Sequence, residues 1–278
     1  MFFTHYQACY PLKAKQINKG LTKENKMNKQ YSSLASVYDL LNADYDYSAY
    51  ASFIDSEIKE NERTKSSLVL DLGCGTGKIT FALRELGYDM TGVDLSPDML
   101  SRARDYARRH NINDVLLLCQ DMTSFELYGT VDACCSCLDS INYLTRLSDV
   151  EKCFKLVHNY LIPNGIFVFD INSEHRFKNV YGCNDYILEN DGVLCAWHNE
   201  YNEKSKICKF FLSIFEETEG GLYERYDEIQ KEKYHSFSQI KALLERSGFE
   251  IIGAYGDLNK KEIEKNDEKW FFVARCIK

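Results

Sequence analysis

The feature that most constrains the fold is a turn with three alternating glycines between an apolar segment and a helical one. Val69–Leu72 is apolar apart from Asp71, and the next five residues are Gly73-Cys74-Gly75-Thr76-Gly77. Glycine adopts positive φ angles and has no Cβ, so such a turn lets the backbone approach a ligand closely. The segment therefore predicts a strand, a tight turn and a helix, with a ligand site beyond the end of the strand.

The same alternation continues along the chain. Apolar strand-like segments and amphipathic helices follow one another, which is typical of a parallel sheet covered on both faces. The expected strands are residues 67–72, 89–94, 115–119, 133–137 and 165–171, and the expected helices are residues 45–60, 78–86, 96–110 and 148–161. Ser96 and Pro97 mark a helix start, because serine caps an N-terminus and proline needs no donor there.

Polar-alternating segments follow the fifth expected strand and predict an antiparallel β insertion. They span residues 191–201, 206–217 and 222–233, before a helix over 236–247 and strands over 250–255 and 270–276. We therefore expect an α/β fold: a doubly wound Rossmann-like sheet with a terminal antiparallel strand pair and an antiparallel insertion after strand five.

This pattern divides the chain into four parts. They are a disordered leader (1-26), an N-terminal helical cover (27-65), a ligand-binding core (66-173 and 236-278) and an antiparallel substrate-cap insertion (174-235). The leader has five lysines against one glutamate and no amphipathic period, which favours disorder. Met27 opens the segment that reads as the start of the fold, so the native start, Met1 or Met27, is left open.

Composition narrows the function classes. A net charge of -8 argues against nucleic-acid binding, which needs clustered lysine and arginine, and no apolar run approaches the roughly 18 residues of a membrane helix. We expect the eleven cysteines to be reduced thiols of a cytoplasmic protein. Cys134, Cys135 and Cys137 do not predict a metal site, because adjacent residues on a strand point to opposite faces.

An acidic residue, Asp94, ends the strand after the glycine turn, seventeen residues past Gly77. A carboxylate at this position can accept hydrogen bonds from two ribose hydroxyls. Nicotinamide enzymes share this feature, but they usually need a third glycine or alanine where this chain has Lys78. The glycine spacing therefore argues against a nicotinamide dinucleotide.

The spacing Gly73, Gly75, Gly77 after Asp71 resembles the first motif of the class I S-adenosylmethionine-dependent methyltransferases. The resemblance includes Asp94, the segment Gln120-Asp121-Met122 and the segment Leu161–Gly165, and spans approximately residues 30–278. Ala35–Leu41 and Cys137–Leu144 resemble a bacterial small-molecule group, similar in layout to glycine or sugar N-methyltransferases. The resemblance implies transfer of a methyl group from S-adenosylmethionine to nitrogen or oxygen of a small molecule.

The resemblance also implies roles for individual residues. Asp71 would anchor the methionine ammonium, Asp94 would hold the ribose diol and Asp121 would accept the adenine amino hydrogen. The full set of expected cofactor-binding residues is Tyr38, Asp71, Gly73, Cys74, Gly75, Thr76, Gly77, Asp94, Leu95, Asp121, Met122 and Asp139.

No general base stands out, and the candidates for a catalytic residue are Asp139 and Tyr143. Asp139 follows the fourth expected strand, where it could hold the methionine ammonium, orient the acceptor or cap the next turn. Aromatic and histidine side chains of the insertion could contact substrate, although such residues usually pack within a sheet. They are Trp197, His198, Tyr223, Tyr226 and His235.

Three other functions stay open at this point. A non-catalytic cofactor-binding interaction protein would show damage in the glycine turn, and none is visible. An aminopropyltransferase would need an acidic polyamine site, which the insertion does not reveal. Methylation of RNA or protein is disfavoured by the net charge. The sequence does not identify the acceptor or distinguish a monomer from a homodimer.

Overall fold

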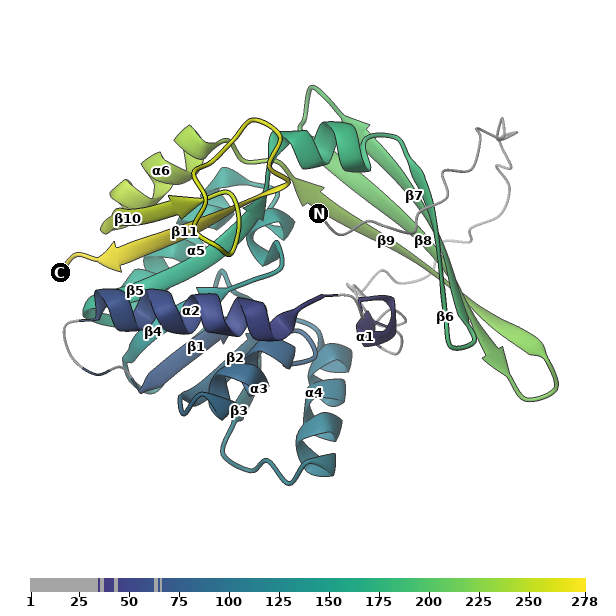
Figure 1. The fold of residues 1–278 in the computed structure, drawn as a ribbon, viewed down its shortest axis with the longest axis horizontal. Helices are drawn as coiled ribbons and strands as arrows, with labels where there is room; N and C mark the ends of the chain where they lie inside the picture. Colours follow the sequence, from purple (N-terminus) through teal and green to yellow (C-terminus); the bar gives the residue numbers. More distant parts are fainter. Residues whose placement is uncertain (1–34, 36–37, 43–44, 63–64, 66) are drawn as a thin grey trace.

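The computed structural model describes residues 35, 38–42, 45–62, 65 and 67–278. The predicted leader and part of the predicted cover lie outside these residues. Two sheets lie side by side: a seven-stranded sheet with helices on both faces, and a four-stranded sheet that extends from it as an arm (Figure 1). Among the described residues, no helix is long and apolar enough to cross a membrane.

The seven-stranded sheet is doubly wound, as predicted. Its strands are β1 Leu68–Leu72, β2 Asp89–Asp94, β3 Leu116–Cys119, β4 Val131–Ser136, β5 Leu161–Asn172, β10 Phe249–Tyr255 and β11 Lys269–Cys276. They lie in the order β10-β11-β5-β4-β1-β2-β3, and β11 is antiparallel to both of its neighbours. The chain order reverses at β1, which has β2 on one side and β4 on the other. A crevice opens beyond the carboxyl ends of the strands at such a reversal.

Helices cover both faces of this sheet because alternate strand residues point to opposite sides. The helices are α2 Tyr47–Asn61, α3 Lys78–Glu85, α4 Pro97–Arg109, α5 Leu147–Tyr160 and α6 Phe237–Arg246. Val69 lies in the apolar cluster of α2 and α3, whereas Leu70 and Leu72 lie in the cluster of α5 and α6. The predicted cap is present, since Ser96 Oγ accepts the Met99 N–H. The start of α6 carries a capping box that the sequence analysis did not identify.

The insertion forms the second sheet, which is fully antiparallel in the order β6-β7-β8-β9. Its strands are β6 Asp185–Asn190, β7 Val193–Asn202, β8 Ile207–Thr218 and β9 Leu222–Lys233. Strand β6 and the short helix Arg176–Tyr181 were not expected from the sequence. Asp191-Gly192 between β6 and β7 is a two-residue hairpin loop, with φ angles of +44° and +77°. An Asp-Gly pair is typical of such a hairpin loop, so it is the sequence signal that could have revealed β6.

Most element boundaries differ from the sequence prediction by one or two residues, and two of the differences have a visible cause. The helix expected from residue 45 begins at Tyr47, because the Asp46 carboxylate caps it by accepting the Ala49 N–H at 2.9 Å. Strand β5 begins at Leu161, so the predicted turn lies within the strand as an irregular segment. Asn164 has a φ of +65°, and the register to β4 shifts there.

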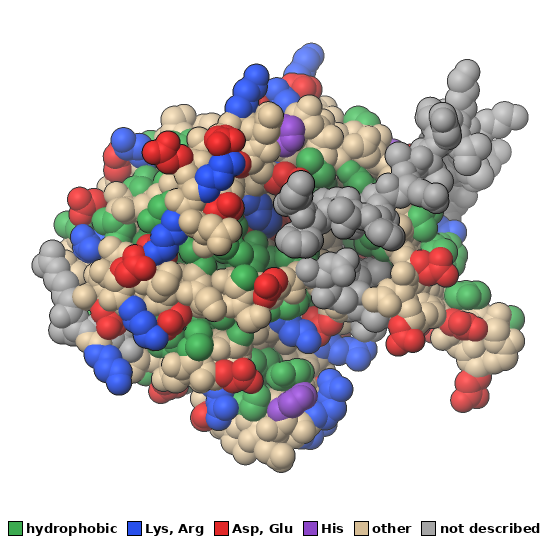
Figure 2. All heavy atoms as spheres, in the orientation of Figure 1, with side chains coloured by type: hydrophobic (Ala, Val, Ile, Leu, Met, Phe, Trp, Pro, Cys, Tyr) green, Lys and Arg blue, Asp and Glu red, His purple; other side chains and the backbone are tan. Residues whose placement is uncertain are grey.

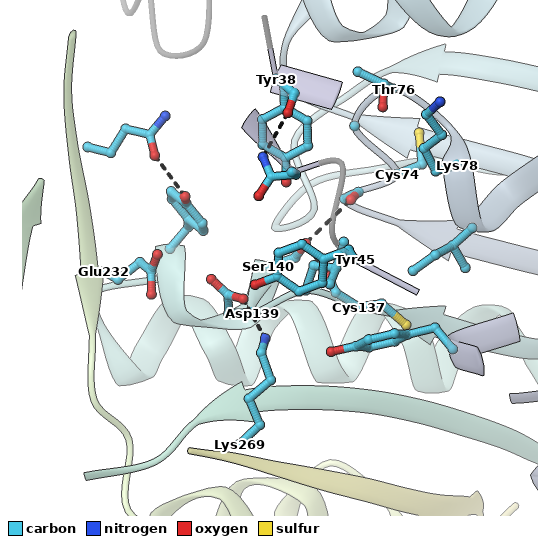
Figure 3. Close-up of a pocket in the computed structure, with 18 of the residues that line it drawn as sticks. Tyr38, Tyr45, Cys74, Thr76, Lys78, Cys137, Asp139, Ser140, Glu232 and Lys269 are labelled. Carbon is cyan, nitrogen blue, oxygen red and sulfur yellow. Dashed lines mark hydrogen bonds and ion pairs between the residues drawn. The ribbon is translucent and has the colours of Figure 1, made fainter. Parts of the chain in front are cut away.

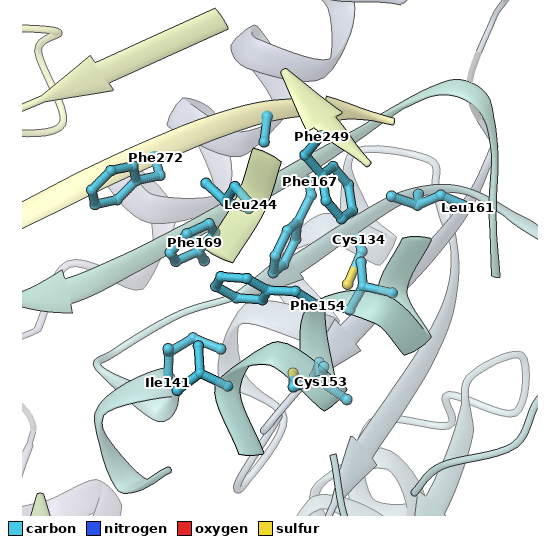
Figure 4. Packing of buried hydrophobic residues seen from close by; sticks show 14 of the residues in the cluster. Cys134, Ile141, Cys153, Phe154, Leu161, Phe167, Phe169, Leu244, Phe249 and Phe272 are labelled. Carbon is cyan, nitrogen blue, oxygen red and sulfur yellow. The ribbon is translucent and has the colours of Figure 1, made fainter. Parts of the chain in front are cut away.

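Stacked aromatic rings fill the core beneath α5 and α6 (Figure 4). Phe167 and Phe169 lie on the same face of β5, with ring centroids 4.7 Å apart. Phe169 also stacks on Phe272 of β11 at 5.1 Å and contacts Phe154 of α5 at 5.3 Å. Phe169 therefore joins the parallel strands, the antiparallel pair and the helical layer.

Replacement of this ring tests its structural role. We predict that Phe169→Ala lowers the free energy of unfolding by about 3–5 kcal/mol, because a fully buried ring is lost and leaves a cavity. Urea unfolding followed by circular dichroism measures the change. Tyr128→Ala is the control: this side chain is fully exposed, and its loss should change stability by less than about 0.5 kcal/mol. Equal effects of the two substitutions would contradict this packing.

Candidate functional site

The glycine turn between β1 and α3 has the positive φ angles that only glycine adopts without strain. They are +80° at Gly73, +54° at Gly75 and +80° at Gly77. A Cβ on Gly73 would lie 2.7 Å from Ser140 Oγ, and one on Gly77 would lie 2.7 Å from the Phe81 ring. A Cβ on Gly75 would meet nothing within 4 Å. The outer glycines therefore allow close packing, and the central one faces open space.

Asp94, at the end of β2, is joined to this turn. Its Oδ2 accepts the Gly75 N–H at 2.8 Å, and its Oδ1 accepts the Ser96 N–H at 2.8 Å. Burial raises the pKa of the carboxyl group, although the backbone N–H groups of Ser96, Gly75 and Leu95 oppose this shift. The next side chain, Leu95, is 54% exposed. A carboxylate and an apolar side chain thus lie together beside the turn.

Asp71 in β1 is more deeply buried, and its exposed fraction is 2%. Its Oδ2 accepts the hydroxyl of Thr80 in α3 at 2.6 Å. Burial raises its pKa to about 6, and hydrogen bonds from Thr80 and Cys135 limit the shift. In this structure Asp71 braces the first turn of α3, and it also lines the adjoining cavity.

A cavity of about 1710 Å³ lies between the carboxyl ends of the core strands and the second sheet. Eleven of the twelve expected cofactor-binding residues line it, and Gly77, the N-cap of α3, does not. The eleven are Tyr38, Asp71, Gly73, Cys74, Gly75, Thr76, Asp94, Leu95, Asp121, Met122 and Asp139. The catalytic candidate Tyr143 lines the same cavity. The fold thus brings together residues from five separate segments.

The short helix α1, Tyr38–Leu41, is tied to the glycine turn. Asp39 accepts the Thr76 hydroxyl at 2.6 Å and pairs with Lys78 at 3.3 Å. Tyr38 lines the cavity, and burial raises the pKa of its hydroxyl. These contacts place α1, one described segment of the predicted cover, against the turn.

Asp121 and Met122 follow β3 at the same edge. Asp121 Oδ1 accepts the backbone N–H and the hydroxyl of Thr123, at 2.7 and 2.8 Å. The terminal methyl group of Met122 lies 3.4 Å from where a Cβ on Gly73 would be. The Met122 side chain therefore borders the glycine turn, while Asp121 stabilises its own loop and keeps its other oxygen available.

The loop after β4 carries Asp139 in a strained conformation. Leu138 and Asp139 have φ angles of +54° and +58°, which are uncommon outside glycine. Asp170 holds this loop, since its carboxylate accepts the backbone N–H groups of Leu138 and Asp139 at 2.6 and 3.0 Å. Non-glycine residues are held in such conformations mainly at functional sites.

A buried lysine, which the sequence reading missed, contacts both of these carboxylates. Lys269 Nζ lies 2.6 Å from Asp139 Oδ1 (Figure 3) and 2.7 Å from Asp170 Oδ2. Burial opposes ionisation of Asp139, but the charges of Lys269 and Arg176 hold its pKa below the usual value. Asp139 is therefore an ionised group with a partner inside the protein.

The second sheet contributes polar side chains to the same cavity, and these were also missed. Gln230 and Glu232 of β9 line it. Gln230 accepts the Tyr143 hydroxyl at 2.9 Å, and Glu232 accepts the Asn172 side-chain amide at 2.9 Å. Tyr143 thus links the core to the second sheet.

Of the five insertion side chains considered as substrate contacts, Trp197 lines the cavity. His198 lies at the surface, 2.6 Å from Asp185. His235 is buried, and its ring contacts the Leu144 carbonyl at 3.0 Å. Tyr223 and Tyr226 do not line the cavity.

Comparison with known proteins agrees with this geometry. Residues 69–165 match a sequence family described as a methyltransferase domain. The chain is 31% identical over 251 residues to YqeM of Bacillus subtilis, which is provisionally named a methyltransferase; the match covers 89% of this chain and 98% of YqeM. The chain belongs to the class I S-adenosylmethionine-dependent methyltransferases.

Structural similarity covers the same extent of this methyltransferase. A crystal structure of a S-adenosylmethionine-dependent methyltransferase from Clostridium acetobutylicum matches with a TM-score of 0.80 and 32% identity, over 89% of this chain and 99% of that one. A shorter match, 34% identical over 139 residues, is to the dTDP-3-amino-3,4,6-trideoxy-alpha-D-glucopyranose N,N-dimethyltransferase of Streptomyces venezuelae. It covers 49% of this chain and 56% of that enzyme.

The raised pKa of Asp71 predicts a pH-dependent stability. Between its ordinary value of 3.8 and about 6, the folded state binds more protons at Asp71 than the unfolded state does, so stability falls as pH rises. Asp71→Asn removes this effect. We predict that the unfolding free energy of the variant, relative to wild type, rises by about 2.4 kcal/mol between pH 4 and 7.

Urea unfolding at several pH values measures this difference. Asp89→Asn is the matched control, because Asp89 is exposed at the start of β2, the strand next to that of Asp71. Its difference from wild type should stay within about 0.5 kcal/mol at every pH. A flat difference for Asp71→Asn would contradict the burial of an ionisable carboxyl group there.

Proposed function

We propose that this enzyme transfers a methyl group from S-adenosylmethionine to a small-molecule acceptor. The observation that carries the proposal is the hydrogen bond from the Gly75 N–H to the Asp94 carboxylate. It places a glycine backbone that faces open space beside a carboxylate at the edge of the cavity. Each Asp94 oxygen already accepts one backbone N–H and has a further lone pair for a ribose hydroxyl.

The residues at this end of the cavity fit the cofactor. Gly73 and Gly75 would border its methionine part, with the Asp71 carboxylate beneath the turn. Asp94 would hold the ribose hydroxyls, and the exposed Leu95 side chain and Met122 would cover the adenine ring. The second oxygen of Asp121 would accept a hydrogen bond from the adenine amino group.

When bound, S-adenosylmethionine supplies a sulfonium methyl group, which is already a strong electrophile. The protein therefore has mainly to position the acceptor and exclude water. Orientation of two reactants can contribute about 7–11 kcal/mol to lowering a barrier. The second sheet and Tyr143, held by Gln230, enclose the cavity and would provide this positioning.

The proposed acceptor is small because the second sheet borders the cavity. The core, residues 66–173 and 236–278, would bind the cofactor, and the insertion, residues 174–235, would act as the substrate cap. Acidic and basic side chains are interspersed on the face in Figure 2, without the basic patch typical of nucleic-acid binding. The partial match to a sugar N,N-dimethyltransferase supports a small acceptor.

Isothermal titration calorimetry tests the cofactor assignment. We predict binding of S-adenosylmethionine and S-adenosylhomocysteine but not of NADH. Asp94→Ala should weaken binding about tenfold or more, equivalent to about 1.4 kcal/mol, because the ribose loses its acceptor.

Asp89→Ala is the control on the same strand, and its affinity should match that of wild type. Unchanged affinity of Asp94→Ala would refute the ribose assignment. Binding of NADH, or no binding of either S-adenosyl compound, would contradict the proposed function.

A further inference from the structure

Strand β9 presents buried polar side chains where a sheet normally presents apolar ones. Alternate residues of a strand share a face, and Gln230 and Glu232 are 5% and 3% exposed. Their cross-strand neighbours on β8 are the apolar residues Phe210 and Cys208. Burial of a polar side chain costs free energy unless the side chain has a hydrogen-bond partner. Gln230 and Glu232 therefore indicate a polar binding site within the cavity.

The charges around the cavity favour a cationic ligand. In the described part of the chain, each lysine or arginine that lines the cavity already has a carboxylate partner. The pairs are Lys78–Asp39 at 3.3 Å, Arg176–Glu268 at 2.8 Å, Lys261–Asp267 at 3.3 Å and Lys269–Asp139 at 2.6 Å. An anionic acceptor would therefore compete with existing ion pairs.

Carboxyl groups outnumber cations where β9 meets the core. The Asp139 carboxylate faces Glu232 as well as its ion-pair partner Lys269. Figure 3 shows Lys269 and Glu232 approaching Asp139 from different strands. The local groups are four carboxyls, Asp139, Asp170, Glu232 and Glu268, and two cations, Lys269 and Arg176. The carboxyl groups exceed the cations by two, so the cluster favours a ligand that carries a further positive charge.

An aromatic wall adjoins these carboxyl groups. Tyr181 and Phe210 have ring centroids 5.0 Å apart, and Trp197 lies 5.7 Å from Phe210. All three line the cavity. Such a wall can cover the carbon skeleton of a small organic molecule and can attract a cation through its ring faces.

We propose that the acceptor is an amine, bound as its ammonium ion at Asp139 and Glu232, with its carbon skeleton against Tyr181, Trp197 and Phe210. For transfer, the ammonium ion would pass one proton to the Glu232 carboxylate, and the freed nitrogen lone pair would take the methyl group as the methyl–sulfur bond breaks and S-adenosylhomocysteine leaves. This inference rests on the proposed function, because it assigns a substrate class to the same cavity. Glu232 is a substrate-binding residue in this view, and Asn172 positions it.

The protonation of Glu232 gives the proposal an observable consequence. Burial and the negative charge of Asp139 raise the pKa of Glu232 well above its usual value. The remaining groups that face it, Asn172, Lys269 and Arg176, lower the pKa but do not reverse the shift. Glu232 therefore holds its proton to a higher pH than a solvent-exposed glutamic acid does. An adjacent ammonium ion favours the carboxylate, so binding releases the Glu232 proton to solvent.

Calorimetry with amines and their matched alcohols tests this proposal in the presence of saturating S-adenosylhomocysteine. The probe pairs are benzylamine and benzyl alcohol, cyclohexylamine and cyclohexanol, and glucosamine and glucose. We expect at least one amine to bind about tenfold or more tightly than its alcohol at pH 7. Titrations in buffers of different ionisation enthalpy should show proton release that approaches one per amine bound.

Variants separate this role from a structural one. Glu232→Gln should bind S-adenosylhomocysteine as wild type does, release no proton and bind the amine about tenfold more weakly. Asp139→Asn should also weaken amine binding. Glu224→Gln, an exposed change on the same strand, should leave all three quantities unchanged.

Two results would overturn the amine assignment while S-adenosylhomocysteine still binds: no preference for any amine over its alcohol, or proton release that persists in Glu232→Gln. Failure of wild type to bind S-adenosylhomocysteine would instead contradict the proposed function, so the two failures are distinguishable.

Discussion

The hydrogen bond from the Gly75 backbone to the Asp94 carboxylate fixes the arrangement on which the site depends. Asp94 also accepts the Ser96 N–H, so one carboxylate sets both the glycine turn and the start of α4. Gly73 has no Cβ, and this lets Ser140, with Asp139 beside it, pack directly against the turn. The geometry of one turn therefore brings the ends of β1, β2 and β4 to a common edge.

The second sheet completes the cavity that this edge begins. Its strand β9 is connected to the core by the Tyr143–Gln230 and Asn172–Glu232 hydrogen bonds, each 2.9 Å long. The cavity is then bordered by backbone and carboxylate at one end and by carboxyl groups and aromatic rings at the other. These two ends match the two substrates of a methyl transfer, a nucleoside cofactor and an acceptor.

The sequence predicted the parts of this site that local signals specify. Three alternating glycines identify the turn, and Ser96-Pro97 identifies the start of α4. Local signals do not identify the charged cluster around Asp139. Lys269 is 130 residues from Asp139 in the sequence, and the two side chains pair only because β11 joins the sheet. Alternation along β9 predicted a strand but not which face is buried, since a shift of one residue exchanges the faces. Glu232 was therefore not identified as a site residue.

A crystal structure of the protein with S-adenosylhomocysteine would test the central claim most directly. We predict density for the adenosine beside Asp94 and Leu95, and density for the homocysteine part along the turn formed by Gly73 and Gly75. The end of the cavity near Asp139 and Glu232 should remain accessible to an acceptor. Density that fills the end near Glu232, or a ligand bound away from the glycine turn, would contradict the division of the cavity.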